Sequence, residues 1–114
     1  EEVLVVAQVE TMQAVDNLKD ILSVDNIDVV FLGPTDLSSS MGLPGQTTSP
    51  KVIKVIEECG RQIVAAGKAA GTIAGDPEAF RRWRSKGFQY LCTGASSFFV
   101  GAARSYIQGV RELK

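Results

Sequence analysis

Two carboxylates and one amide stand where apolar runs of the sequence end. Gln8 and Glu10 close a run at the start of the chain, and Asp36 follows the next run, 27–32. If the runs are neighbouring parallel strands, their ends lie about 4.8 Å apart. Two acids at that range repel unless a proton or a cation lies between them. An oxygen-only pair suits a hard ion such as Mg²⁺ or Mn²⁺, which a 2-keto acid can chelate.

The same residues have simpler interpretations, which spacing alone leaves open. Asp36 can cap a turn through its side chain, and Glu10 can complement the dipole of a following helix. Gln8 can satisfy a buried backbone group. The serine run 38–40 is more typical of a solvated loop than of a nucleophile, and Asp76, which precedes a proline, is typical of a helix cap.

The elements that position these residues alternate between strand and helix, which implies parallel strands joined by right-handed crossovers. Four such βα units form half of a (β/α)8 TIM barrel, and they could also close as an open doubly wound sheet. The open sheet has little support as a nucleotide site, because no glycine-rich phosphate loop follows the first run. We predict strands at 3–9, 27–32, 68–74 and 88–92, helices at 11–23, 50–66, 77–86 and 98–113, and a long loop at 33–49.

Further details of packing follow from the pattern. Uniformly apolar strands predict a sheet covered on both faces. The basic residues of helix 77–86 are expected on an exposed face, and Phe80 and Trp83 in the core or at an interface. In the last helix the pattern predicts four inward residues: Val100, Ala103, Ile107 and Val110.

Composition narrows the function further. The 114 residues are 45% hydrophobic with a net charge of −1, which fits one domain and gives no case for nucleic acid or a membrane surface. The apolar runs are too short to span a bilayer. With no basic, apolar leader at Glu1, we expect no signal peptide and a cytoplasmic location. Cys59 and Cys92 are predicted to be free thiols in apolar surroundings. The sequence has no histidine, which excludes a Ser-His-Asp or Cys-His site and any His-ligated zinc within it.

Three stretches of the chain carry a resemblance to a known family. They are "QVETMQAVDNL" (8–18), "IDVVFLGPTDLSSSMGLPGQ" (27–46) and "GTIAGDPEAFRRWRSKGFQYLCTGASS" (71–97). They resemble the carboxyl-terminal half of the HpcH/HpaI aldolases, metal-dependent class II pyruvate aldolases with macrophomate synthase as a fungal relative. The resemblance implies that residues 1–114 are the carboxyl-terminal half of a TIM-barrel aldolase domain.

The resemblance also implies roles for individual residues. Glu10 and Asp36 match metal ligands for Mg²⁺ or Mn²⁺, with Co²⁺ or Zn²⁺ as possible substitutes. Gln8 matches a glutamine beside the bound keto acid, and the amides of Thr35 and Asp36 match those that receive its carboxylate. Ile73 matches an apolar residue of the pocket. Gln8 and Glu10 would then point to the same side of their strand.

The implied reaction cleaves 2-keto-4-hydroxy acids to pyruvate and an aldehyde through a metal-bound pyruvate enolate, with oxaloacetate decarboxylation as a side reaction. The family's acid/base histidine and its substrate-gripping arginine lie in the amino-terminal half. We therefore expect no catalytic residue in this chain, and inactivity as an isolated half. The expected partners are pyruvate or oxaloacetate and a complementary amino-terminal half-barrel, or a homo-oligomer whose dimers exchange helix 98–113.

Two alternatives remain. The first is a non-catalytic half-barrel interaction module in a larger assembly, because open edges of a parallel sheet call for a partner. The second is an acyl-CoA lyase of the citrate-lyase β type, although no basic pocket for the CoA phosphates is evident.

Overall fold

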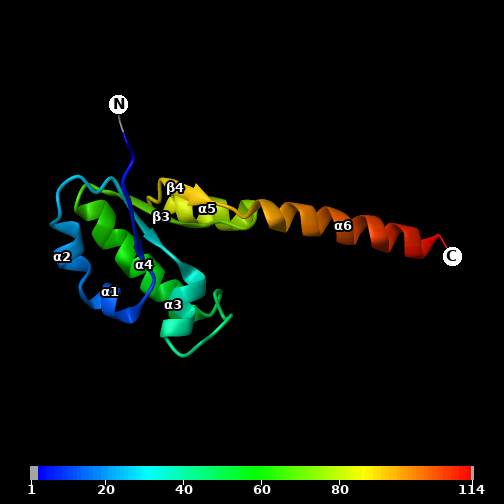
Figure 1. The fold of residues 1–114 in the computed structure, drawn as a ribbon, viewed down its shortest axis with the longest axis horizontal. Helices are drawn as coiled ribbons and strands as arrows, with labels where there is room; N and C mark the ends of the chain where they lie inside the picture. The colour runs from blue at the N-terminus through cyan, green and yellow to red at the C-terminus, as the bar shows by residue number, and fades with distance from the viewer. Residues whose placement is uncertain (1–2, 114) are drawn as a thin grey trace.

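A parallel four-stranded sheet organises the protein, whose computed structural model describes residues 3–113 (Figure 1). Each strand pairs with the next along the chain, in the order β1-β2-β3-β4. The strands are β1 (Val6–Val9), β2 (Val29–Leu32), β3 (Ala69–Ile73) and β4 (Tyr90–Cys92). The helices are α1 (Met12–Asp16), α2 (Leu18–Leu22), α3 (Pro34–Ser40), α4 (Pro50–Ala65), α5 (Pro77–Ser85) and α6 (Ala95–Glu112).

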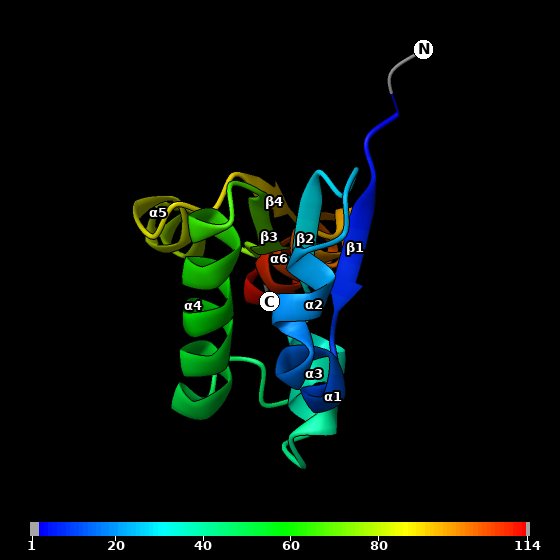
Figure 2. The ribbon, with the colours of Figure 1, turned by 90° about the vertical axis from the view of Figure 1, so that its left-hand side faces the viewer.

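The strand order decides between the two predicted architectures. A doubly wound sheet reverses its strand order at a switch point, whereas a barrel adds each strand beside the previous one. The order here runs without reversal. Figure 2 shows α1, α2 and α4 in front of the strands and α6 behind them. The described chain therefore has the architecture of half a (β/α)8 barrel.

The main hydrophobic cluster lies on one face of the sheet, and on the other face the buried strand residues are Val29 and Phe31 of β2 and Gly71 of β3. Leu18, Ile56 and Trp83 from three helices pack in one cluster with alternate strand residues. On the opposite face Val6 and Ile73 are 37% and 39% exposed, and Gln8 is exposed as well. The prediction that both faces are covered is wrong for the described chain. The strand residues of the covered face are Val9, Val30, Leu32, Ala70 and Thr72, all 0–1% exposed.

Two helix starts follow the sequence prediction. Ser49 accepts a hydrogen bond from the Val52 amide at 3.3 Å, and α4 begins at the next residue, Pro50. Asp76 accepts from the Ala79 amide at 2.8 Å at the start of α5. Both starts combine a polar cap with a proline in the first turn, where the missing N–H has no intrahelical partner to lose.

Other boundaries differ from the predictions. The first strand begins at Val6 rather than at residue 3, and the predicted helix 11–23 is divided at Asn17 into α1 and α2. The predicted loop 33–49 contains α3. The hydroxyls of Ser38 and Ser39 donate to the Thr35 carbonyl at 2.7 and 3.1 Å, so these serines stabilise a helix instead of a solvated loop.

Helix α6 extends away from the rest of the protein (Figure 1). The prediction that its apolar side faces inward is wrong here: Val100, Ile107 and Val110 are 44%, 49% and 46% exposed, and no residue of α6 is buried. None of the helices within residues 3–113 has the length and hydropathy needed to cross a bilayer. Cys59 and Cys92 are free, as predicted, although Cys92 is only half-buried.

Candidate functional site

The carboxylate of Glu10 lies against the carboxyl end of β2. Glu10 directly follows β1, and Gly33 directly follows β2. A Cβ added at Gly33 would stand 2.9 Å from Oε2 and 3.2 Å from Cβ of Glu10. Glycine therefore makes room for the carboxylate to reach across the neighbouring strand end. The backbone supports this arrangement, since the Gly33 amide donates to the Val9 carbonyl at 3.3 Å.

Gln8 adjoins this carboxylate. Its Nε2 donates to Glu10 Oε2 at 3.3 Å. The two residues are separated by one position, so their side chains leave the strand on the same face. Gln8 is exposed on the open face of the sheet, and the amide is accessible to a bound molecule.

Helix α3 brings Asp36 to the same edge of the sheet. Asp36 lies in the first turn of α3, which begins directly after Gly33. A hydrogen bond of 2.9 Å from the Met12 amide to Ser40 Oγ joins the end of α3 to the segment that follows Glu10. The segments that carry the two acids are thus tied together at both ends of α3.

The start of α3 leaves donors free. Among the three helices that begin with proline, α4 and α5 have side-chain caps, whereas Gly33 gives α3 none. The first amides of a helix have no intrahelical acceptor. Within the described residues, the amides of Thr35 and Asp36 accordingly have no side-chain acceptor. Such amides favour an anionic group.

Ile73 completes the set of predicted residues. It is the last residue of β3. Gln8, Phe31 and Gly71 are register partners across β1, β2 and β3 and share the open face. Ile73 comes two positions after Gly71 and so lies on the same face. The five predicted residues therefore lie at the carboxyl ends of β1, β2 and β3: Gln8 and Ile73 are strand residues, whereas Glu10, Thr35 and Asp36 come after their strands. Within residues 3–113, no three His, Cys, Asp or Glu side chains gather closely enough to hold a metal ion, so this chain offers a carboxylate pair at most.

Two positioning residues escaped the sequence analysis. The sequence predicts Gly33 in the long loop 33–49 and Ser40 in a solvated serine run. The contact of Gly33 with Glu10 and that of Ser40 with Met12 both join segments distant in sequence. The sequence signal for Gly33 was a glycine directly after an apolar run. Nothing in the local sequence identifies Glu10 or Met12 as the contacting residue.

Comparison with known proteins identifies the family of this chain. The family model for HpcH/HpaI aldolase/citrate lyase matches residues 1–101. The chain belongs to the HpcH/HpaI aldolase/citrate lyase family. This confirms the family that the three sequence stretches indicated.

Individual relatives show how much of a family member the chain represents. It is 42% identical over 113 residues to a hydroxypyruvate/pyruvate aldolase of Cupriavidus necator, covering 98% of this chain and 42% of that protein. A 2-keto-3-deoxy-L-rhamnonate aldolase of Klebsiella pneumoniae is 43% identical over 103 residues, 90% of this chain and 39% of that protein. The crystal structure of an HpcH/HpaI aldolase from Desulfitobacterium hafniense superposes with a TM-score of 0.89 at 30% identity, over 99% of this chain and 44% of that one. The chain thus spans about two fifths of these relatives, as these coverages give.

Proposed function

We propose that residues 1–114 are the carboxyl-terminal half of a class II aldolase domain, in which Glu10 and Asp36 hold a divalent cation. The observation that supports this most directly is the Glu10 carboxylate seated over Gly33, where a Cβ would lie 2.9 Å away. Because Gly33 has no side chain, the end of β2 has room for this acid. The oxygen-only donor set suits Mg²⁺ or Mn²⁺. When bound, the cation supplies the Lewis acidity that stabilises an enolate.

The residues around the acids would bind a small 2-keto acid. The free amides of Thr35 and Asp36 receive its carboxylate, the Gln8 amide donates to a substrate oxygen, and Ile73 contacts its apolar end. The whole protein would cleave a 2-keto-4-hydroxy acid to pyruvate and an aldehyde. The names of the relatives, a hydroxypyruvate/pyruvate aldolase and a 2-keto-3-deoxy-L-rhamnonate aldolase, support this reaction class.

The acid/base histidine that the family resemblance implies has no counterpart in this chain, whose sequence contains no histidine, so we infer that proton transfer relies on a group from outside it. Loss of a general acid/base costs about 10²–10⁴-fold in rate. The chain alone should therefore bind Mn²⁺ and a keto acid but turn over slowly. A complementary amino-terminal half-barrel would supply the missing group.

Direct metal binding tests the proposal. Free Mn²⁺ is measured by electron paramagnetic resonance during titration of the chain, and pyruvate formation from oxaloacetate is measured in parallel. We expect Glu10→Gln and Asp36→Asn each to weaken Mn²⁺ binding by at least about tenfold, a typical cost at a metal site. Glu112→Gln on α6 is the matched control, with the same change of charge away from the site. Unchanged binding in both site variants would refute the assignment.

An interaction role for the open surfaces has its own support. Phe98, Phe99 and Tyr106 of α6 are 64%, 77% and 75% exposed, and the open face of the sheet presents Val6 and Ile73. We infer that the open face contacts the complementary half-barrel and that α6 packs on another copy. Native mass spectrometry at low micromolar concentration tests this. A stable, well-folded monomer would contradict the pairing of α6.

A further inference from the structure

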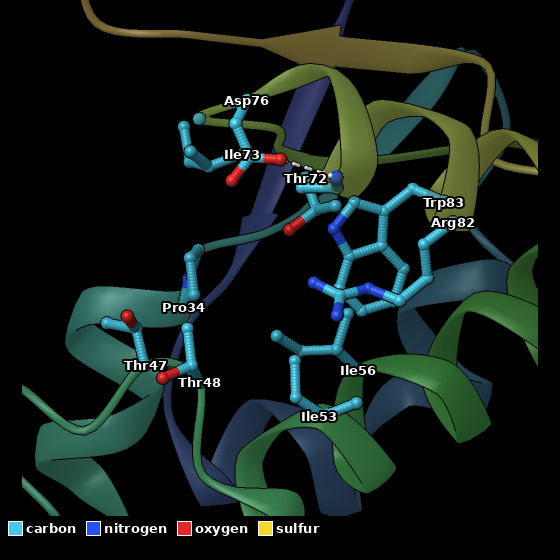
Figure 3. A pocket seen from close by; sticks show the side chains of 12 residues that line it. Pro34, Thr47, Thr48, Ile53, Ile56, Thr72, Ile73, Asp76, Arg82 and Trp83 are labelled. Carbon is cyan, nitrogen blue, oxygen red and sulfur yellow. Dashed lines mark hydrogen bonds between the residues drawn. The ribbon is translucent and has the colours of Figure 1, made fainter. Parts of the chain in front are cut away.

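A cavity of about 220 Å³ lies between α4 and α5, beneath the carboxyl end of β3 (Figure 3). Its aliphatic wall includes Ile53 and Ile56 of α4, and Thr47 and Thr48 border it from the segment before α4. The volume is far larger than one water molecule requires. The cavity adjoins the candidate metal site through Ile73, but its polar groups belong to other elements.

One donor that borders this cavity, the indole N–H of Trp83, has no hydrogen-bond partner among residues 3–113. Trp83 is only 3% exposed, and its indole nitrogen faces the cavity (Figure 3). In residues 3–113 the hydrogen bonds made by lining side chains are those of Thr72 to the Leu32 carbonyl, 2.9 Å, and of Asp76 with the Ala79 amide, 2.8 Å. Every fully buried side-chain nitrogen or oxygen in that range has a hydrogen-bond partner. The indole N–H has none, so it is not fully buried and can be reached from the cavity. A buried indole N–H normally finds an acceptor.

A charged donor lies beside it. The Arg82 guanidinium carbon is 5.2 Å from the centre of the Trp83 ring. Lys86 and Arg61 on neighbouring helix surfaces have acidic partners, whereas Arg82 forms no ion pair with any described residue. Stacking on the indole favours this orientation of the exposed guanidinium and leaves its N–H edge free to bind.

The chemistry of these groups selects the ligand. Indole and guanidinium donate hydrogen bonds and accept none, so they require an oxygen-rich acceptor. Asp76 adds a negative charge to the same cavity, and repulsion penalises a dianionic phosphate more than a singly charged carboxylate. The isoleucine wall accommodates a hydrocarbon chain. We propose that this cavity binds a carboxylate carried on a short aliphatic chain, with Trp83 Nε1–H and Arg82 as its donors.

The indole N–H itself reports on binding. Trp83 is the only tryptophan in the sequence, and loss of its signal in Trp83→Phe identifies the resonance. The chain is titrated in EDTA with butyrate, inorganic phosphate or 1-butanol while the indole N–H is followed by ¹H–¹⁵N NMR. We expect butyrate to shift the resonance saturably. EDTA removes divalent cations, so failure here is distinct from failure of the metal site.

Arg82→Gln and Arg81→Gln form a matched pair, since both residues are exposed on α5 and only Arg82 lines this cavity. We expect Arg82→Gln to weaken butyrate binding by at least about tenfold, the value of a charge-assisted hydrogen bond, and Arg81→Gln to leave it unchanged. No saturable shift, an equal shift with 1-butanol, or undiminished binding in Arg82→Gln would overturn the proposal. Tighter binding of phosphate than of butyrate would overturn the carboxylate assignment.

Discussion

Substitution of Gly33 by alanine tests the geometry of the proposed metal site without removing a ligand. The backbone at Gly33 has φ −84° and ψ 100°, which alanine adopts without strain. The added Cβ would stand 2.9 Å from Oε2 and 3.2 Å from Cβ of Glu10. The carboxylate must therefore rotate away from the end of β2, and the Glu10 Cβ must shift by a few tenths of an ångström.

The expected cost falls on binding and not on folding. A displaced rotamer costs about 0.5–1.5 kcal/mol, whereas replacement of glycine by alanine at an unstrained position gains about 0.4–1 kcal/mol. The free energy of unfolding should change by less than about 1 kcal/mol. Loss of the orientation of one metal ligand typically weakens metal affinity about 10–100-fold.

The assay combines Mn²⁺ titration with urea unfolding of Gly33→Ala. Gly109→Ala is the control, because a Cβ at Gly109 in α6 meets nothing within 4 Å. In a double-mutant cycle, Gly33→Ala should add little to the loss already caused by Glu10→Gln, since both act on one carboxylate. Wild-type Mn²⁺ affinity in Gly33→Ala, or full additivity with Glu10→Gln, would refute the inference that the position of the Glu10 carboxylate against Gly33 serves metal binding.

Three further predictions concern packing and titration. Gly60→Ala should destabilise the protein by about 1–3 kcal/mol in urea unfolding, because the new Cβ would clash with the edge of the Phe88 ring; an unchanged midpoint would contradict this packing. Burial, with a smaller effect from the charge of Glu58, raises the pKa of Cys59 from 9.0 to about 11. The unfolded thiol therefore ionises first, and stability should fall between about pH 9 and 11 by at most about 2.7 kcal/mol, a loss that Cys59→Ala should abolish. Ser40→Ala removes the acceptor of the Met12 amide and should cost about 1 kcal/mol; no loss would show that this hydrogen bond does not hold α3 in place.

The sequence was most informative where structure depends on adjacent residues. The caps at Ser49 and Asp76 and the prolines after them specify the starts of α4 and α5 through contacts three residues apart. The strand and helix order was equally accessible, because apolar runs and helical periodicity are local patterns. Helix α3 was missed because serine has low helix propensity, and its hydroxyls compete for backbone groups unless, as at Ser38, they bond within the helix.

Features that depend on distant contacts could not be predicted. The Glu10 carboxylate can lie against residue 33 only because β1 and β2 are neighbours and residue 33 has no side chain. Arg82 was expected on an exposed helix face, and it is exposed, yet it also borders a cavity formed with α4. The apolar pattern of α6 indicated that one side is buried, but local periodicity does not say against what, and no residue of α6 is buried within the described chain.

The one-sided core explains how a partial barrel can still shape a site. Val9 and Leu32, which immediately precede the two strand exits, are both 0% exposed and belong to the cluster packed against the helices. The positions of Glu10 and Gly33 are thus held by residues of this chain. On the open face, Phe31 and Tyr90 meet edge to face at 6.1 Å across Gly71, whereas Val6 and Ile73 are 37% and 39% exposed. The complementary half-barrel that we propose should therefore affect proton transfer and closure of the site more than the placement of Glu10.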